Sequence, residues 1–174
     1  MNNVRLPALF FAFMLVLAVL QWVQVYPQLP DRVACHFAVD GTPNGWQSKQ
    51  DFFLIPCIVV AGCTLVSFLL PLILALLPPE LINLPNKYYW LAPKRRAETS
   101  RFMTAHMAWF GCGLLFVVLY AISKAINANL PNRGQFNSLG MEYAIGGFML
   151  YGVLVFGHML RHFYNVPPSS DSSL

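Results

Sequence analysis

Four long apolar stretches dominate this sequence, and they restrict the possible folds more than any other feature. They cover about residues 6–25, 52–77, 104–126 and 142–160. At ~1.5 Å per residue, a helix of about 20 residues crosses a hydrocarbon core of ~30 Å. With 57% hydrophobic and 10% charged residues, the chain is too apolar for a soluble domain, in which about a quarter of the residues are charged. We therefore predict an all-α membrane protein, a four-transmembrane-helix bundle.

The first apolar stretch follows Asn2-Asn3-Val4-Arg5, so a signal peptide is the alternative to a membrane span. The sequence Ala18-Val19-Leu20 is a poor small-x-small cleavage site, and apolar residues continue to Val25. We therefore expect an uncleaved span. Residues 1–166 are expected to form a single membrane domain, and the serine- and proline-containing tail 167–174 is expected to be disordered.

Lysine and arginine are distributed unequally between the two sides of the predicted bundle. The side with both termini holds seven (Arg5, Lys87, Lys94, Arg95, Arg96, Arg101 and Arg161) and the other side holds four (Arg32, Lys49, Lys124 and Arg133). Because loops rich in Lys and Arg stay in the cytoplasm, we predict cytoplasmic termini and an extracytoplasmic loop 26–51. Attraction to anionic lipid at the inner face accounts for the net charge of +4, so no nucleic-acid partner is expected.

The polar loop 26–51, between the first two spans, is the most residue-specific segment. Residues 33–40 alternate as in a half-buried strand. One side holds Val33, Cys35, Phe37 and Val39, and the other Ala34, His36, Ala38 and Asp40. Asp40-Gly41 and Asn44-Gly45 are turn dipeptides that tolerate positive φ. We predict a short strand that doubles back as an ordered hairpin-like cap, with Phe37 and Trp46 toward the lipid headgroups.

Polar and aromatic side chains of this loop are the candidates for binding a ligand or partner: Asp31, His36, Asp40, Asn44, Trp46 and Lys49. Imidazole and carboxylates suit zinc, but His36 and Asp40 on one strand would lie ~13 Å apart. We therefore expect no metal, and the alternative requires the loop to fold back. The sequence has no HExxH, CxxC or phosphate-binding glycine loop. We expect no cofactor and no enzyme activity, and rank a membrane enzyme using His36 lowest.

The linker between the second and third spans combines basic and aromatic residues. Its candidate lipid- or partner-binding face consists of Asn86, Lys87, Trp90, Lys94, Arg95 and Arg96. Such a segment suits contact with anionic lipid at the inner interface, and a cytoplasmic protein partner is the alternative. Pro93 suits a first helical position, so the third helix is expected to begin near it.

Ionisable side chains also occur within or near the spans. Lys124 lies near the end of the third span and Glu142 near the start of the fourth. Because an isolated charge at that depth is costly, we predict that they face each other as a pair, with snorkelling of Lys124 as the alternative. His106 and His158 lie near the inner ends of their spans. We interpret them as neutral imidazoles tolerated near the interface, although such residues are also functional candidates.

Two motifs resemble a known family. Residues 29–49, LPDRVACHFAVDGTPNGWQSK, are similar to the signature of the small bacterial membrane proteins grouped as DUF1648, which also begins the SdpI-type immunity proteins. The matching residues are Leu29-Pro30-Asp31, His36-Phe37, Gly41, Asn44-Gly45-Trp46 and Ser48-Lys49. Ala34 stands where the family often has proline. The segment INLPNKYYWLAP, residues 82–93, resembles the cytoplasmic linker of the same family.

The resemblance implies a non-enzymatic protein of the bacterial inner membrane, of the immunity or signalling type. Loop 26–51 would then recognise a peptide or protein partner. The alternative is a small transporter or channel subunit, which would have to form a homo-oligomer through its glycine-bearing spans.

Overall fold

The computed structural model describes residues 4–38, 40–131, 136 and 139–166. Within these residues, four helices are long and apolar enough to cross a membrane, which confirms the predicted fold class. The first, third and fourth are α1 (Arg5–Val25), α5 (Arg96–Asn129) and α6 (Leu139–Tyr164). The second span combines α2 (Lys49–Thr64), η2 (Leu65–Leu69) and α3 (Leu70–Leu76). The predicted tail 167–174 and Arg133 lie outside the described residues.

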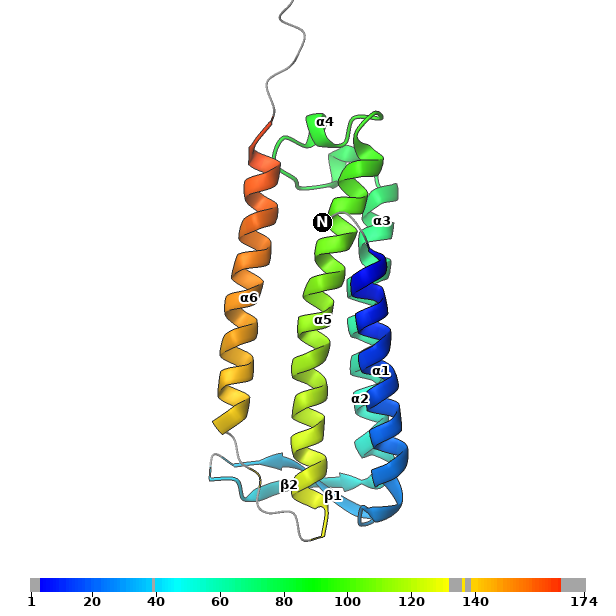
Figure 1. Cartoon of the computed structure of the whole chain (residues 1–174), viewed down its shortest axis with the longest axis vertical. Helices are drawn as coiled ribbons and strands as arrows, with labels where there is room; N and C mark the ends of the chain where they lie inside the picture. The colour runs from blue at the N-terminus through cyan, green and yellow to red at the C-terminus, as the bar shows by residue number, and fades with distance from the viewer. Residues whose placement is uncertain (1–3, 39, 132–135, 137–138, 167–174) are drawn as a thin grey trace, which may run out of the picture.

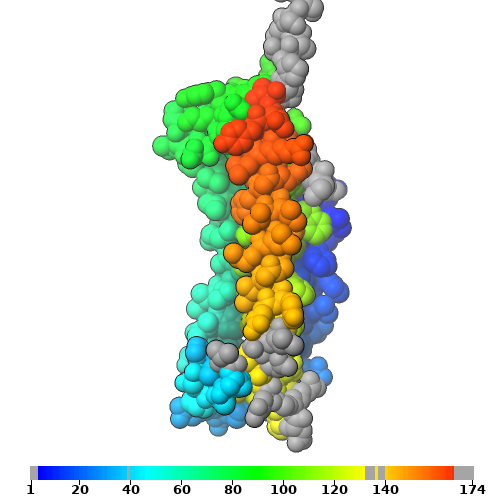
Figure 2. Space-filling view, turned by 90° about the vertical axis from the view of Figure 1, so that its left-hand side faces the viewer, coloured from blue at the N-terminus to red at the C-terminus, as the bar shows by residue number. Residues whose placement is uncertain are grey.

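α5 is the central helix of the bundle. It lies between α6 on one side and α1, α2 and α3 on the other (Figure 1). Its residues Ala105, Ala108 and Leu115 are fully buried, and the small side chains of the two alanines allow the neighbouring helices to approach closely. Figure 2 shows α6 along one face of the molecule, with the green linker beside its C-terminal end. We call that end, with residues 79–95, the linker end, and the opposite end, with residues 26–51, the cap end.

The second span changes from α- to π-helical geometry over η2. Pro71 lacks an N–H, and in a regular helix its ring would collide with the carbonyl of Ser67. A wider turn before the proline avoids this collision. Ser67 itself is buried and donates a hydrogen bond to the carbonyl of Cys63 at 2.5 Å. A Cβ on Gly111 of α5 would lie only 1.9 Å from Ser67 Oγ, so the two spans are in close contact here.

The predicted hairpin is present. After the short helix η1 (Tyr26–Gln28), strand β1 (Arg32–Phe37) pairs with the antiparallel strand β2 (Pro43–Ser48). The chain turns at Asp40-Gly41, where Gly41 has φ of +84° and the N–H of Ala38 donates to the carbonyl of Thr42 at 2.8 Å. The prediction that Asn44-Gly45 also forms a turn was wrong. These residues lie inside β2, and among the described glycines only Gly41 has a positive φ.

The predicted alternation along β1 holds only in part. Val33 and Ala34 are both buried, whereas Cys35 and His36 are both exposed. The pairing register shifts between Ala34 and His36, which leaves Cys35 without a partner opposite it. Such a bulge opposes two residues to one and reverses the side-chain pattern beyond it. Val39, the last residue of the expected apolar side, lies outside the described residues.

The linker between the second and third spans connects α3 to α5. It contains the short helices η3 (Pro79–Leu81) and α4 (Lys87–Trp90), which lie across the linker end of the bundle (Figure 1). The third long helix begins at Arg96, close to the predicted start near Pro93. Asn86 and Trp90 of this linker donate hydrogen bonds to carbonyls at the end of α6.

Candidate functional site

The cap (residues 29–49) is attached to the end of α5 through one side-chain amide. Asn129 Oδ1 accepts a hydrogen bond from the N–H of Ala34 at 2.8 Å, and Asn129 Nδ2 donates to the carbonyl of Ala34 at 2.9 Å. The same Nδ2 donates to the carbonyl of Ala125 at 2.8 Å. The amide thus satisfies the free edge of β1 as a neighbouring strand would.

Apolar side chains reinforce this attachment. Val33 is 0% exposed. It belongs to a buried cluster that joins the cap to three helices or their flanking residues: Val25, Leu29, Val33, Phe52, Ile126 and Leu130. Burial of one such side chain contributes ~1.5–3 kcal/mol. The cap is therefore packed as part of the bundle.

Two of the predicted binding residues have structural roles within the cap. The Lys49 ammonium donates to the carbonyl of Leu29 at 2.9 Å and lies 4.6 Å from the ring centroid of Tyr26. The Asp40 carboxylate accepts hydrogen bonds from the hydroxyl of Thr42 at 2.6 Å and from its N–H at 2.9 Å. Both hydrogen bonds lower the pKa of Asp40 from its ordinary value, and the bond from the Thr42 hydroxyl has the larger effect. Asp31 is exposed, and its carbonyl accepts the N–H of Lys49.

Three other predicted residues form an exposed surface on the cap. His36 Nδ1 donates a hydrogen bond to Asn44 Oδ1 across the two strands. Trp46 is 51% exposed and follows Asn44 by two residues on β2. Gly45 allows the strands to approach, since a Cβ there would lie 2.9 Å from the Cβ of His36. We call His36, Asn44 and Trp46 the cap surface.

His36 and Asp40 are bonded to different neighbours, His36 to Asn44 and Asp40 to Thr42. Among the described residues, no group of three His, Cys, Asp or Glu side chains could hold a metal ion. The arrangement of the cap surface is suited to hydrogen bonding and aromatic contact.

At the linker end, four of the six residues of the predicted lipid- or partner-binding face donate side-chain hydrogen bonds within the chain: Asn86, Lys87, Trp90 and Arg96. Asn86 Nδ2 donates to the carbonyls of Phe163 and Tyr164 at 2.9 and 3.2 Å. Trp90 Nε1 also donates to the carbonyl of Phe163, at 2.9 Å. These bonds satisfy carbonyls in the last turn of α6, which lack partners within the helix.

Arg96 has the same role at the end of α3. Its Nε donates to the carbonyl of Ala75 at 3.0 Å, and its guanidinium also donates to the carbonyl of Leu77. By contrast, Lys94 and Arg95 are exposed, and Arg95 lies 3.9 Å from the ring centroid of Tyr89. Lys87, half-buried, lies 5.4 Å from the ring centroid of Tyr88. These three residues carry the basic character of the linker surface.

Three histidines gather around Phe102 near the linker end. The rings of His106 on α5 and His158 on α6 stack with centroids 5.3 Å apart. Phe102 lies 4.0 Å from His106 and 4.0 Å from His162, between ring centroids. His106 is 4% exposed; its Nδ1 donates to the carbonyl of Phe102 at 2.8 Å, and its buried Nε2 has no partner in the described part of the chain.

Sequence reasoning considered His106 and His158 singly and missed His162. The spacing of His158 and His162 is i, i+4, which places both on one face of α6. That spacing was the available signal. This spacing does not predict that the two histidines contact α5, because that contact depends on how α5 and α6 pack against each other.

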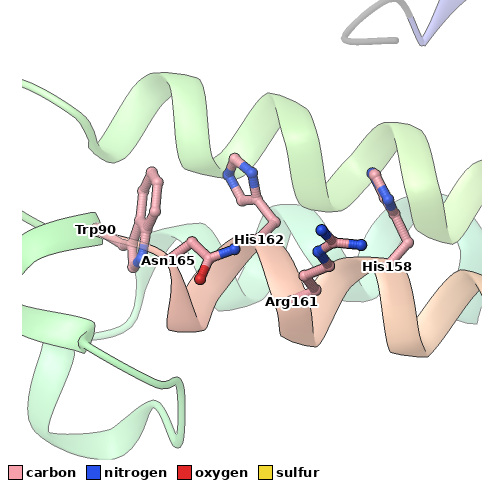
Figure 3. Close-up of a pocket in the computed structure, with 5 residues that line it drawn as sticks. All are labelled: Trp90, His158, Arg161, His162 and Asn165. Atoms are coloured by element: carbon pink, nitrogen blue, oxygen red, sulfur yellow. The ribbon is translucent and has the colours of Figure 1, made fainter. Parts of the chain in front are cut away.

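A cavity of about 350 Å³ opens beside these histidines (Figure 3). Trp90 of the linker forms one wall, and the other lining residues are His158, Arg161, His162 and Asn165. We call this cavity the linker-end pocket. The ring centroids of Trp90 and His162 are 4.6 Å apart, so the aromatic wall is in contact with the imidazole.

Two further expectations concern the spans. The Lys124 ammonium lies 5.5 Å from the ring centroid of Tyr120, one turn earlier on α5, and Glu142 is exposed. Pairing of Lys124 with Glu142 therefore stays a prediction.

The second expectation concerns the glycines of the spans, which the alternative function would use for homo-oligomer formation. Gly113 contacts α6 within the chain, since a Cβ there would lie 2.9 Å from the ring of Tyr151. This glycine, like Gly111, packs against a helix of its own chain.

Comparison with known proteins identifies one family. Residues 13–60 match the family model described as a domain of unknown function, DUF1648. The matched segment covers most of α1, the whole cap and most of α2. This match confirms the resemblance predicted from the cap motif. The linker 82–93 lies outside the matched segment, so the resemblance of the linker and the SdpI-type assignment stay predictions.

The chain is also similar to an uncharacterized protein of Archaeoglobus fulgidus. The two are 26% identical over 131 residues, which cover 74% of this chain and 62% of the relative. The chain thus spans less than two thirds of the length of that relative. No solved structure matches.

Proposed function

We propose that this membrane protein, whose residues 13–60 match DUF1648, is a non-enzymatic recognition protein of the immunity or signalling type. The cap would bind a peptide or protein partner outside the cytoplasm. One observation carries the proposal: the cap is packed on α5 through Asn129 and Val33, yet exposes the cap surface.

The chemistry of the cap surface supports this role. A preformed surface loses less conformational entropy on binding than an unstructured loop does. Tryptophan is enriched among the residues that dominate protein–protein binding energy. Because His36 Nδ1 is bonded to Asn44, the imidazole is held in one orientation, with Nε2 on the opposite side of the ring. We expect Trp46 to supply contact area and His36 to supply a hydrogen bond to the partner.

The proposal includes a bacterial inner membrane, with both termini in the cytoplasm. The seven basic residues that the sequence predicts on the side of the termini, against four on the other side, support this orientation. Lys94 and Arg95, both exposed, would lie at the anionic inner leaflet and contact its lipids. In this orientation the cap faces the periplasm or cell exterior, where it would meet a secreted peptide or the outer domain of a membrane partner.

The proposal is tested by photocrosslinking in intact cells of the native host. A photoreactive phenylalanine analogue replaces Trp46, which is exposed. We expect an adduct of larger mass on irradiation, and the adduct should disappear when His36→Ala is added. The matched control carries the same analogue at Tyr88, an exposed aromatic residue of the linker, and should not form that adduct.

Two results would contradict the proposal. One is the absence of any adduct from position 46 at normal expression. The other is an adduct whose yield is unchanged by His36→Ala, since this would mean that the partner contacts the analogue without the cap surface.

A further inference from the structure

The linker-end pocket lies at the opposite end of the bundle from the cap and is independent of the function proposed above. From its lining we infer that the linker-end pocket binds the phosphate group of an anionic membrane lipid. The described lining residues carry one permanent positive charge, on Arg161, and two imidazoles, and no acidic side chain is among them. An anion is therefore the ligand class that this lining favours.

Arg161 is available for a ligand. Basic residues in the last turn of a helix often serve only to stabilise its C-terminal carbonyls. Here Asn86 and Trp90 already donate to the carbonyls of Phe163 and Tyr164. Within the described residues, the guanidinium of Arg161 has no hydrogen-bond or ion-pair partner. Its donors, whose fork geometry matches two oxygens of a phosphate, thus remain unused.

The imidazoles and the indole are held in position by aromatic contacts. His162 lies between the rings of Trp90 and Phe102, at centroid distances of 4.6 and 4.0 Å. His158 stacks on His106 at 5.3 Å. The pocket is therefore formed before a ligand arrives, and its volume of about 350 Å³ lies at the low end of small-ligand pockets, which measure ~300–1,000 Å³. This space accommodates a headgroup and leaves the acyl chains outside.

Depth identifies the source of the phosphate as lipid. A 26-residue helix such as α6 is ~39 Å long, ~9 Å more than the hydrocarbon core. Arg161 and His158 lie three and six residues before the end of α6 at Tyr164, so they fall in the ~5–7 Å headgroup layer or just below it. On the same helix, Leu154, one turn before His158, is exposed. This leucine offers contact to acyl chains below the pocket.

The test uses the full chain purified in detergent, with lipid binding measured by native mass spectrometry. We expect short-chain phosphatidylglycerol to bind about tenfold more tightly than phosphatidylcholine, a ratio that corresponds to ~1.4 kcal/mol. Arg161→Gln should remove this preference. Arg161→Lys keeps the positive charge but lacks the paired N–H donors of the guanidinium, so it should remove about half of the preference on a logarithmic scale. The matched control Arg101→Gln removes an exposed arginine of α5 at the same end and should change the preference less than twofold.

Three outcomes would overturn the inference. If Arg161→Gln and Arg101→Gln reduced the preference for phosphatidylglycerol equally, the lipid would be attracted by the overall positive charge of the linker end and not by the pocket. Equal binding of the two lipids by the wild type would exclude a pocket selective for anionic lipid, because phosphatidylcholine has the same phosphate group but no net charge. Displacement of phosphatidylglycerol by an equal concentration of inorganic phosphate would assign the pocket to a free anion. The melting temperatures of the Arg161 variants in phosphatidylcholine should equal that of the wild type, because the guanidinium of Arg161 has no hydrogen-bond partner within the described residues.

Discussion

The side-chain amide of Asn129 is paired with the backbone of Ala34, 95 positions earlier in the chain, through two hydrogen bonds of 2.8 and 2.9 Å. A two-stranded hairpin alone is marginally stable in water. Here the end of α5 supplies the missing edge partner of β1, and Val33 beside Ala34 is fully buried. The position of the cap surface thus depends on contacts made at the far end of a 34-residue helix.

Replacement of Asn129 tests this relationship. In Asn129→Leu, the N–H and carbonyl of Ala34 lose their partners, and a buried unsatisfied polar group costs ~1–3 kcal/mol. We expect the cap to be cleaved at least tenfold faster by thermolysin while the helices stay intact. The matched change Asn83→Leu, at an exposed asparagine of the linker, should leave the cleavage rate unchanged. Equal rates for Asn129→Leu and the wild type would mean that the amide does not hold the cap.

Gly41 and Gly45 are expected to resist substitution for different reasons. Gly41 has φ of +84°, so Gly41→Ala should cost at least ~1 kcal/mol through backbone strain. Gly45→Ala would place a Cβ 2.9 Å from the Cβ of His36. The second variant should therefore be rescued by His36→Gly, and the first should not, when cap cleavage by thermolysin is compared. Rescue of both variants, or of neither, would refute this distinction.

The contact between Gly111 and Ser67 should be sensitive to added volume. A Cβ on Gly111 would lie 1.9 Å from Ser67 Oγ, and overpacking of this kind costs ~1–3 kcal/mol. Gly111→Ala should lower the melting temperature in detergent, and Gly111→Ala with Ser67→Gly should recover most of the loss. Gly62→Ala is the control, because nothing lies within 4 Å of a Cβ there. An unchanged melting temperature in Gly111→Ala would contradict the close approach.

Lys124 and Glu142 remain a predicted pair. An isolated charge at their depth costs up to ~3 kcal/mol. If they face each other, Lys124→Glu with Glu142→Lys should recover most of the stability lost in either single variant, measured as melting temperature. Simple addition of the two losses would favour the arrangement in which Lys124 lies along Tyr120 and reaches the headgroups.

The elements of the fold follow from local patterns, whereas their contacts do not. The apolar stretches predict the four helices because a span needs only length and hydrophobicity. The dipeptide Asp40-Gly41 marks the turn because Gly41 tolerates positive φ. The burial of both Val33 and Ala34, directly before the bulge at Cys35, is different, because it depends on the position of β1 against α5. The hydrophobic periodicity of the sequence does not predict where β1 lies relative to α5.

The same limit explains the outcome at the linker end. Asn86, Trp90 and Arg96 have the composition of a membrane-surface segment, so sequence reasoning assigned them to lipid or partner contact. In the structure each also bonds a helix-terminal carbonyl. Which carbonyls lie within reach is decided by tertiary packing. His162 was missed for the same reason, since its relation to Phe102 exists only when α6 lies against α5.

The central claim is that the cap is an ordered part of the bundle, and amide hydrogen exchange in lipid nanodiscs tests it most directly. The N–H groups of β1 and β2 that pair the strands, and that of Ala34 in particular, should exchange at least a hundredfold more slowly than an unstructured peptide, because exchange requires local opening. Asn129→Leu should remove this protection at Ala34. Exchange at the unstructured rate throughout residues 32–48 of the wild type would contradict the account.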